Sequence, residues 1–112
     1  MDSTRLNEIF SELTTAQVAD AIVRLGLNPR LAPQGVQALI LGRRLAGRVL
    51  PVRHCGSVDV FFEAMLSAKP GDVLVVDNGG RRDEGCIGDL TALEARAFGI
   101  SGLVIWGCHR DS

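Results

Sequence analysis

Three charged residues near the end of the chain have the types and the spacing to bind a metal ion and an anion together. Asp89 is followed, after twenty intervening residues, by the pair Arg110-Asp111. Carboxylates suit Mg²⁺ and Mn²⁺, which prefer oxygen ligands and keep several waters, and arginine binds a carboxylate through two parallel hydrogen bonds. A divalent cation polarises a 2-keto acid and stabilises the enolate that forms as a C–C bond breaks. These residues therefore predict a site for a divalent cation and a small anionic substrate.

Each of these residues also has a simpler structural explanation. Asp89 stands where a helix is expected to begin, and an aspartate at such a position commonly caps the helix. Arg110-Asp111 can equally form a surface ion pair. The glycine-rich loop at residues 78–85 fits an ordinary turn, and it contains neither of the glycine patterns that bind dinucleotides or phosphates. The spacing alone leaves both interpretations open.

Two apolar segments with a helix between them place the charged residues at one edge of a predicted sheet. Residues 73–77 and 102–106 are apolar runs that predict buried strands, and residues 89–98 predict the helix that joins them. Strand, helix and strand in this order form a βαβ unit with parallel strands. Binding sites in such sheets lie beyond the carboxyl ends of the strands. Residues 78–80 and 107–111 should therefore meet the start of the helix there.

Backbone groups at the start of that helix add a binding element. The N–H groups of Leu90, Thr91 and Ala92 have no partners within the helix, and they would face the same edge, where they suit a substrate carboxylate. Glycines before the helix let the backbone approach a ligand closely; they are Gly79, Gly80, Gly85 and Gly88. We therefore expect Gly88, Leu90 and Thr91 to bind substrate together with Arg110.

The first part of the chain predicts elements that surround this unit. They are helices at residues 3–13, 14–26 and 57–68, and strands at residues 35–40 and 44–52. The second helix should begin with a capping box formed by Thr14 and Gln17. The second strand alternates between apolar and charged residues, which suggests one exposed face.

Composition limits the classes of function. With 112 residues, of which 46% are hydrophobic, the chain fits a single domain over residues 1–112. Its net charge of −1 argues against a nucleic-acid or membrane-surface role driven by charge. No apolar run approaches the roughly 20 residues of a membrane span, and the start of the chain lacks a signal-peptide pattern, so a cytoplasmic location is expected. The three cysteines predict neither a disulfide framework nor a zinc site.

These motifs resemble the RraA-like family, which includes class II pyruvate aldolases acting on 4-hydroxy-4-methyl-2-oxoglutarate. The resemblance runs from residues 13–21 through residues 71–77 to the end of the chain. Its most specific part is Gly88-Asp89-Leu90 followed by residues 102–111. The family's signature is an Asp, twenty residues and then Arg-Asp, and this chain has it in register.

The resemblance implies an α/β fold, the swivelling β/β/α RraA-like domain with a central βαβ unit, assembled into homotrimers or hexamers. It implies Mg²⁺ or Mn²⁺ bound through Asp111, with Asp89 holding metal-bound water. Arg110 and the backbone N–H groups of Leu90 and Thr91 would hold the pyruvate-like part of the substrate, so that Arg110 and Asp89 are the expected catalytic residues. The implied reactions are cleavage of such aldols to pyruvate and decarboxylation of oxaloacetate, both through a pyruvate enolate.

The resemblance also implies an alternative function. Other family members inhibit RNase E by binding it, so a non-catalytic regulator with a ribonuclease partner is the second hypothesis, and a structural fragment without activity is the third. Family members continue well past the Arg-Asp pair, so the chain is expected to be incomplete at its C-terminus and to lack the usual C-terminal elements. Neither direct nucleic-acid binding nor membrane binding is expected.

Overall fold

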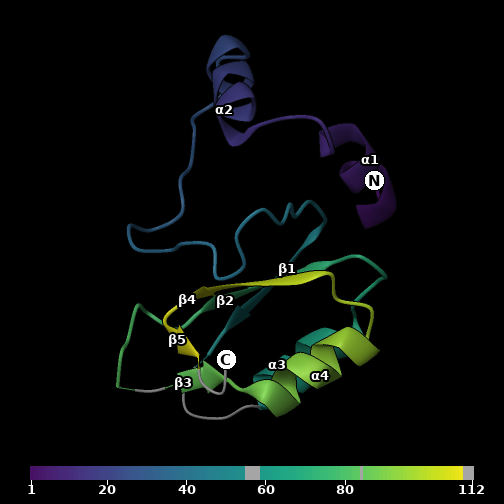
Figure 1. Cartoon of the computed structure of the whole chain (residues 1–112), viewed down its shortest axis with the longest axis vertical. Coiled ribbons are helices and arrows are strands. Elements are labelled where there is room, and N and C mark those ends of the chain that lie inside the picture. Colours follow the sequence, from purple (N-terminus) through teal and green to yellow (C-terminus); the bar gives the residue numbers. More distant parts are fainter. Residues whose placement is uncertain (55–58, 84, 110–112) are drawn as a thin grey trace.

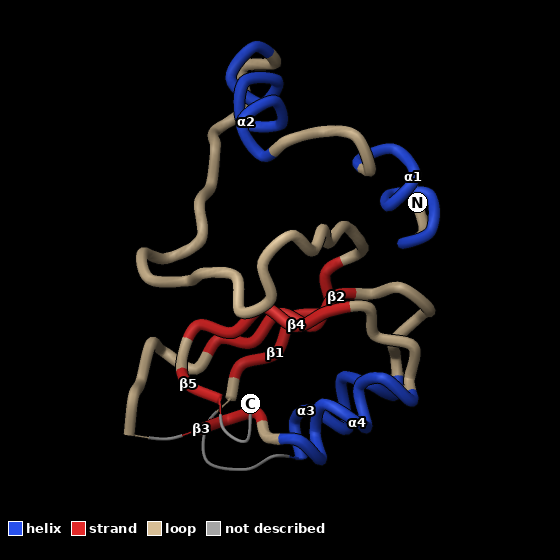
Figure 2. Tube along the Cα trace, in the orientation of Figure 1, coloured by secondary structure: helices blue, strands red, loops and turns tan. Residues whose placement is uncertain are grey.

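A small parallel sheet lies at the centre of the computed structural model (Figures 1 and 2). The structure describes residues 1–54, 59–83 and 85–109. The strands of the sheet are β1 (Val49–Arg53), β2 (Val73–Asp77) and β4 (Gly102–Trp106). They lie in the order β1-β2-β4 and both pairs are parallel, which confirms the predicted βαβ unit. Because Val73 pairs with both Val49 and Gly102, the three strands start and end together.

Two helices cover one face of this sheet and enclose the core (Figure 1). They are α3 (Asp59–Leu66) and α4 (Asp89–Ala97). The buried side chains between helices and sheet are Leu50, Val52, Phe61, Met65, Leu74, Val76, Ile87 and Ala95. Removing a large apolar side chain from water contributes about 1.5–3 kcal/mol, so this layer fixes the helices on the sheet. Among the described residues, no helix has both the length and the apolar character needed to cross a membrane.

The N-terminal helices lie on the opposite side of the sheet (Figure 1). They are α1 (Ser3–Phe10) and α2 (Thr15–Arg24). The side chain of Asp2 caps α1, and Thr14 and Gln17 form the predicted capping box of α2. α2 contributes no buried residue, and it projects away from the sheet. Local capping therefore defines these helices, whereas packing against the sheet does not hold α2.

A buried carboxylate before β2 joins α1 to the sheet. Asp72 is fully buried and accepts hydrogen bonds from Ser3 Oγ (2.7 Å), Arg48 Nη2 (2.7 Å) and the backbone N–H of Lys69 (2.9 Å). Ser3 Oγ also accepts the backbone N–H of Arg48 (2.9 Å). The hydrogen bond from the Arg48 guanidinium is the main reason that the pKa of Asp72 lies well below its usual range.

One predicted strand is wrong, and another is confirmed only in its second half. Residues 35–40 form turns and irregular chain, and the strand predicted at residues 44–52 begins only at Val49. An alternating pattern makes a strand only where a neighbour supplies hydrogen bonds, and no strand pairs with residues 35–48 in the described part of the chain. β4 also differs from expectation, because it forms an edge of its sheet and is only partly buried.

A second sheet was not predicted at all. It consists of β3 (Gly85–Ile87) and β5 (Cys108–His109), which pair in parallel. Residues 78–85 were predicted to form a loop, and no strand was predicted after Trp106. Strands of two or three residues are too short to show a hydrophobic period, so their pairing depends on the sheet that holds them in place.

Replacing Asp72 with Asn should destabilise the protein by about 2 kcal/mol at pH 7, because hydrogen bonds to charged groups contribute about 1.5–3 kcal/mol. The pKa of Asp72 is lower in the folded chain than its unfolded value of about 3.9. Its stabilisation is therefore present above about pH 4 and is lost as the pH falls further. Urea unfolding of both proteins should show a smaller difference at pH 3 than at pH 7.

The matched control is Glu8→Gln, which removes the exposed ion pair with Arg5 (3.2 Å). Such a pair contributes about 0–1 kcal/mol, so this variant should unfold almost as the wild type does. Equal stability of Asp72→Asn and the wild type at pH 7 would contradict the role given to the carboxylate.

Candidate functional site

The two strands of the small sheet lie side by side, and each is followed in sequence by predicted charged residues. β3 and β5 run in the same direction, with Ile87 opposite His109. β3 leads directly to Asp89, and β5 leads in sequence to Arg110 and Asp111, which lie outside the described residues. Because parallel strands end at the same edge, the two chain segments leave from neighbouring points.

Asp89 occupies the first turn of α4 and does not cap it. The N-cap is Gly88, with φ −121° and ψ −172°, and it makes no side-chain capping bond. Asp89 Oδ1 accepts the N–H of Leu90 (2.8 Å), and the residue is exposed. The capping interpretation of Asp89 is therefore wrong. A carboxylate in this position is stabilised by the helix dipole and remains accessible to a ligand.

The backbone N–H groups at the start of α4 are less available than predicted. Ala92 donates its N–H to the carbonyl of Gly88 (3.0 Å), so the prediction of a free group at Ala92 is wrong. Leu90 donates to Asp89, and a ligand would have to replace that contact. The N–H of Thr91 has no hydrogen-bond partner in the part of the chain that the structure describes. Of the three predicted groups, the N–H of Thr91 is thus the one that could bind an anion without giving up a hydrogen bond to another described residue.

A groove of about 1030 Å³ lies beside β4 and includes the start of α4. Its walls come from β4, α4 and residues 36–45, and both Gly88 and Asp89 line it. Much of the lining is apolar, and its charged side chains are Asp89, Arg43, Arg44 and Arg96. Arginines beside an apolar wall suit a small anionic ligand.

The described residues contain one candidate for the predicted cation site, Asp89. Within residues 1–54, 59–83 and 85–109 no group of three His, Cys, Asp or Glu side chains is placed to hold a metal ion. Asp89 provides an exposed carboxylate, and such an oxygen donor fits the water shell of Mg²⁺ or Mn²⁺. The predicted direct ligand, Asp111, and the predicted substrate-binding Arg110 lie outside the described residues, so both assignments stay predictions.

A buried hydrogen-bond network at the strand ends was missed. His54 Nδ1 lies 2.8 Å from Asn78 Oδ1, which also accepts a hydrogen bond from Arg81 Nη2 (2.7 Å). Arg81 Nη2 donates to the carbonyl of His54 as well (3.1 Å). His54 and Asn78 are 4% and 1% exposed. We call His54, Asn78 and Arg81 the strand-end network. His54 directly follows β1 and is buried like Leu50 and Val52, which precede it at a spacing of two residues. That spacing could have been read from the sequence.

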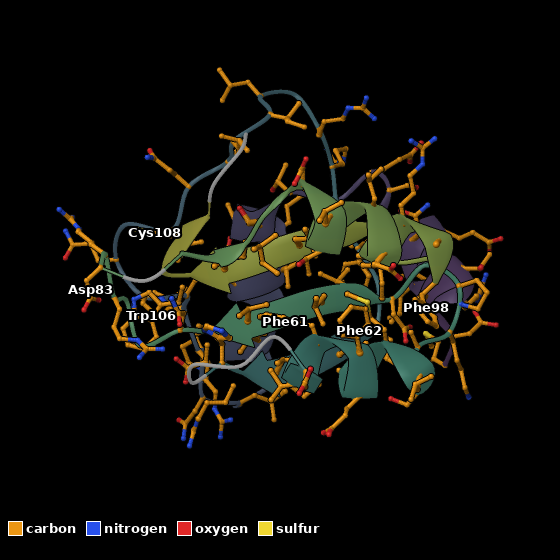
Figure 3. All side chains as sticks on the ribbon, turned by 90° about the horizontal axis from the view of Figure 1, so that it is seen from below. Phe61, Phe62, Asp83, Phe98, Trp106 and Cys108 are labelled. Atoms are coloured by element: carbon orange, nitrogen blue, oxygen red, sulfur yellow. The ribbon has the colours of Figure 1, made fainter. Side chains whose placement is uncertain are left out.

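The glycine pair after β2 forms a turn against Trp106. Gly79 and Gly80 have φ angles of 66° and 69°, and Trp106 O accepts the N–H groups of Asn78 and Gly80 (both 3.1 Å). A Cβ at Gly80 would lie 2.9 Å from Trp106 Nε1. The space beside Gly80 is therefore filled by the indole ring instead of a ligand. Figure 3 shows Trp106 at the same end of the molecule as Cys108, far from Phe98.

Comparison of the sequence with known proteins identifies the same family that the motifs resemble. The RraA-like family, described as Aldolase/RraA, matches residues 15–112. A Hahella chejuensis protein is 46% identical over 65 residues, covering 58% of this chain and 40% of the relative. A Halalkalibacterium halodurans protein is 30% identical over 103 residues, covering 91% and 47%. Both are named "Putative 4-hydroxy-4-methyl-2-oxoglutarate aldolase". The chain spans less than half the length of each.

Two solved structures are similar in fold. The Streptomyces coelicolor protein RraAS2, described as an unusual member of the RNase ES inhibitor RraA protein family, has a TM-score of 0.83 and 27% identity, covering 99% of this chain and 58% of that chain. An uncharacterized protein from Pseudomonas syringae pv. tomato has a TM-score of 0.76 and 30% identity, covering 97% and 51%. The α/β fold implied by the sequence resemblance is confirmed.

Gly80→Ala should lower the free energy of unfolding by about 1–3 kcal/mol more than Gly79→Ala does. Both glycines have positive φ, which costs about 1–2 kcal/mol with a side chain present, but only at Gly80 would the new methyl group meet Trp106. At Gly79 the nearest atom is 3.9 Å from the Cβ position. Trp106 is the only tryptophan, so its fluorescence should change in the Gly80 variant alone. Equal effects of both variants on stability and fluorescence would contradict this packing.

Proposed function

The chain belongs to the RraA-like family, and from that premise we propose that it is a divalent-metal-dependent lyase. Its substrates would be aldols of the 4-hydroxy-4-methyl-2-oxoglutarate type, cleaved to pyruvate, or oxaloacetate, which it would decarboxylate. The single observation that carries the proposal is the parallel pairing of β3 with β5, because these strands lead to Asp89 and to Arg110-Asp111. The names of the relatives support the aldolase class.

In the proposed site, Arg110 binds the carboxylate of the 2-keto acid through two hydrogen bonds. The N–H groups of Leu90 and Thr91 lie at the positive end of the α4 dipole and stabilise negative charge on the same part of the substrate. Gly88 has no side chain to obstruct this approach. These groups act more strongly as charge develops, which is the condition for catalysis rather than simple binding.

The residues that would hold Mg²⁺ or Mn²⁺ are Asp111 directly and Asp89 through water. When bound, such a cation supplies the Lewis acidity that polarises the 2-keto oxygen. The carboxylate of Asp89 can accept the proton of the aldol hydroxyl as the C–C bond breaks, and that proton can return to the carbon that becomes the methyl group of pyruvate. Oxaloacetate loses CO₂ in place of a carbonyl product and has no aldol hydroxyl, so its enolate would take a proton from water. The same residues would bind the substrate in both reactions.

An exposed apolar surface on and after α2 supports protein partners. We define the α2 surface by four side chains that are 58–87% exposed: Val23, Leu25, Leu27 and Leu31. These four residues are close in sequence, and exposed apolar side chains that gather on a surface mark interaction sites. We propose a homo-oligomer, a trimer or hexamer, that covers this surface. The second candidate function is ribonuclease binding at the same surface, favoured by the similarity to a member of the RNase ES inhibitor family.

Alanine substitution of Arg110, Asp111 or Asp89 should lower Mg²⁺- or Mn²⁺-dependent decay of oxaloacetate by about 100-fold or more, the scale on which loss of one charge-stabilising group acts. The rate is measured as pyruvate formation, which a coupled assay detects. The control is Asp83→Ala, an exposed carboxylate of the preceding loop. Metal-dependent rates in the Arg110 and Asp111 variants that equal the wild-type rate would refute the lyase assignment.

Leu25→Asp with Leu27→Asp should reduce the oligomer to smaller species, because each charge would be buried in the proposed interface. Sedimentation velocity measures this mass. Leu66→Asp, an equally exposed leucine on α3 (77%), is the matched control. An unchanged mass in the double variant, with loss of binding to an RNase E-type enzyme, would instead assign the α2 surface to the ribonuclease.

A further inference from the structure

One atom of the strand-end network is buried and has no hydrogen-bond partner within residues 1–54, 59–83 and 85–109. It is His54 Nε2, whereas Nδ1 of the same ring faces Asn78 Oδ1. Arg81 can only donate, so the Asn78 atom between them must be the oxygen, and His54 Nδ1 must carry a proton. In the neutral ring, the lone pair of Nε2 is then buried without a hydrogen-bond donor among the described residues. The tautomer of His54 is therefore fixed by Asn78.

Stability alone gives little reason for a histidine here. A buried polar atom without a partner costs about 1–3 kcal/mol, which offsets the bond that Nδ1 makes. The imidazole stacks on Phe61, with ring centroids 5.3 Å apart and planes inclined by 12°. A phenyl ring would keep that stacking without the buried polar atom. The distinctive contribution of His54 is thus the orientation that it imposes on Asn78.

Asn78 occupies the space in which the chain leaves β4. A Cβ at Gly107 would lie 2.6 Å from Asn78 Cβ and 2.8 Å from its Nδ2. The backbone N–H of Asn78 donates to the carbonyl of Trp106, the residue before Gly107. The side chain and backbone of Asn78 therefore both define the path from β4 to β5.

β5 needs such support because it is very short. It consists of Cys108 and His109, and its pairing with β3 is irregular between Gly85 and Ile87. Two residues cannot fix their own register, which strands usually gain from length and from a buried face. The next residues in sequence are Arg110 and Asp111.

We propose that His54 and Asn78 are positioning residues for the site at the carboxyl edge. His54 fixes the amide of Asn78, and Asn78 fixes the chain at Gly107, so that β5 pairs with β3 in the register from which Arg110 and Asp111 follow. The catalytic consequence rests on the proposed function, whereas the effect on the path of residues 107–109 does not.

The experiment compares three His54 variants of ¹⁵N-labelled protein by NMR and by Mn²⁺ titration. In the wild type, Nδ1 of His54 should be protonated and Nε2 should not. His54→Phe should shift the backbone amide signals of residues 107–109 and weaken Mn²⁺ binding about tenfold. His54→Asn places an amide nitrogen where Nδ1 stood, so it should restore both toward wild type, while His54→Gln, whose amide lies one carbon further out, should not.

Val52→Ala is the matched control, since it opens the same buried face of β1 without touching the network. It should lower stability and leave the signals of residues 107–109 in place. The oxaloacetate rate should follow the same order, with a loss of about tenfold in kcat/KM for His54→Phe and recovery in His54→Asn. Should the Phe variant not fold, the Asn and Gln variants make the same comparison.

Unchanged signals of residues 107–109 in both His54→Phe and His54→Gln would overturn the inference, as would a wild-type His54 protonated at Nε2 alone. An inactive wild type that shows the expected amide shifts would refute the proposed lyase and leave the positioning role intact. An active wild type whose rate and amide signals do not depend on His54 would refute the positioning role and leave the proposed lyase intact.

Discussion

The buried carboxylate of Asp72 is the interaction on which the rest of the sheet depends. Parallel strands are joined by long crossovers, so no tight turn sets their register. Asp72 instead binds Ser3 of α1 and Arg48 before β1, while its carbonyl accepts the N–H of Ser101 just before β4 (2.8 Å). One residue at the start of the central strand thereby aligns the start of every strand in the three-stranded sheet. With the starts aligned, the carboxyl ends are aligned as well.

At those carboxyl ends a second buried polar residue, Asn78, plays the corresponding part. It connects the ends of β1 and β2 through His54 and reaches β4 through the carbonyl of Trp106. The two residues thus lie at opposite ends of β2, and the apolar core lies between them. Past Asn78, the regular structure at this edge of the described chain consists of the short β3–β5 pair. The proposed site is therefore built on the shortest strand pairing in the described structure. The longer three-stranded sheet supports that pairing.

The sequence predicted the elements whose patterns are long or whose chemistry is local. The runs at residues 73–77 and 102–106 gave both strands of the βαβ unit, and the capping box gave the start of α2. Residues 35–40 were assigned wrongly because an apolar segment does not reveal whether a partner strand exists. The position of Asp89 at the start of α4 was predictable, but its contact with the N–H of Leu90 was not, because that choice depends on backbone geometry. The strand-end network joins residues distant in sequence, and only the burial alternation of β1 hinted at it.

The proposal that the exits of β3 and β5 form one cation site is tested most directly by paramagnetic broadening in ¹⁵N-labelled protein. Substoichiometric Mn²⁺ would be added with oxalate, a dianion that resembles the pyruvate enolate. The amide signals of residues 88–91 and 108–109 should broaden together, before those of α2, and Asp111→Ala should abolish the effect. Broadening that is confined to other acidic surface residues, or that persists unchanged in the Asp111 variant, would contradict a cation site at this edge of the sheet.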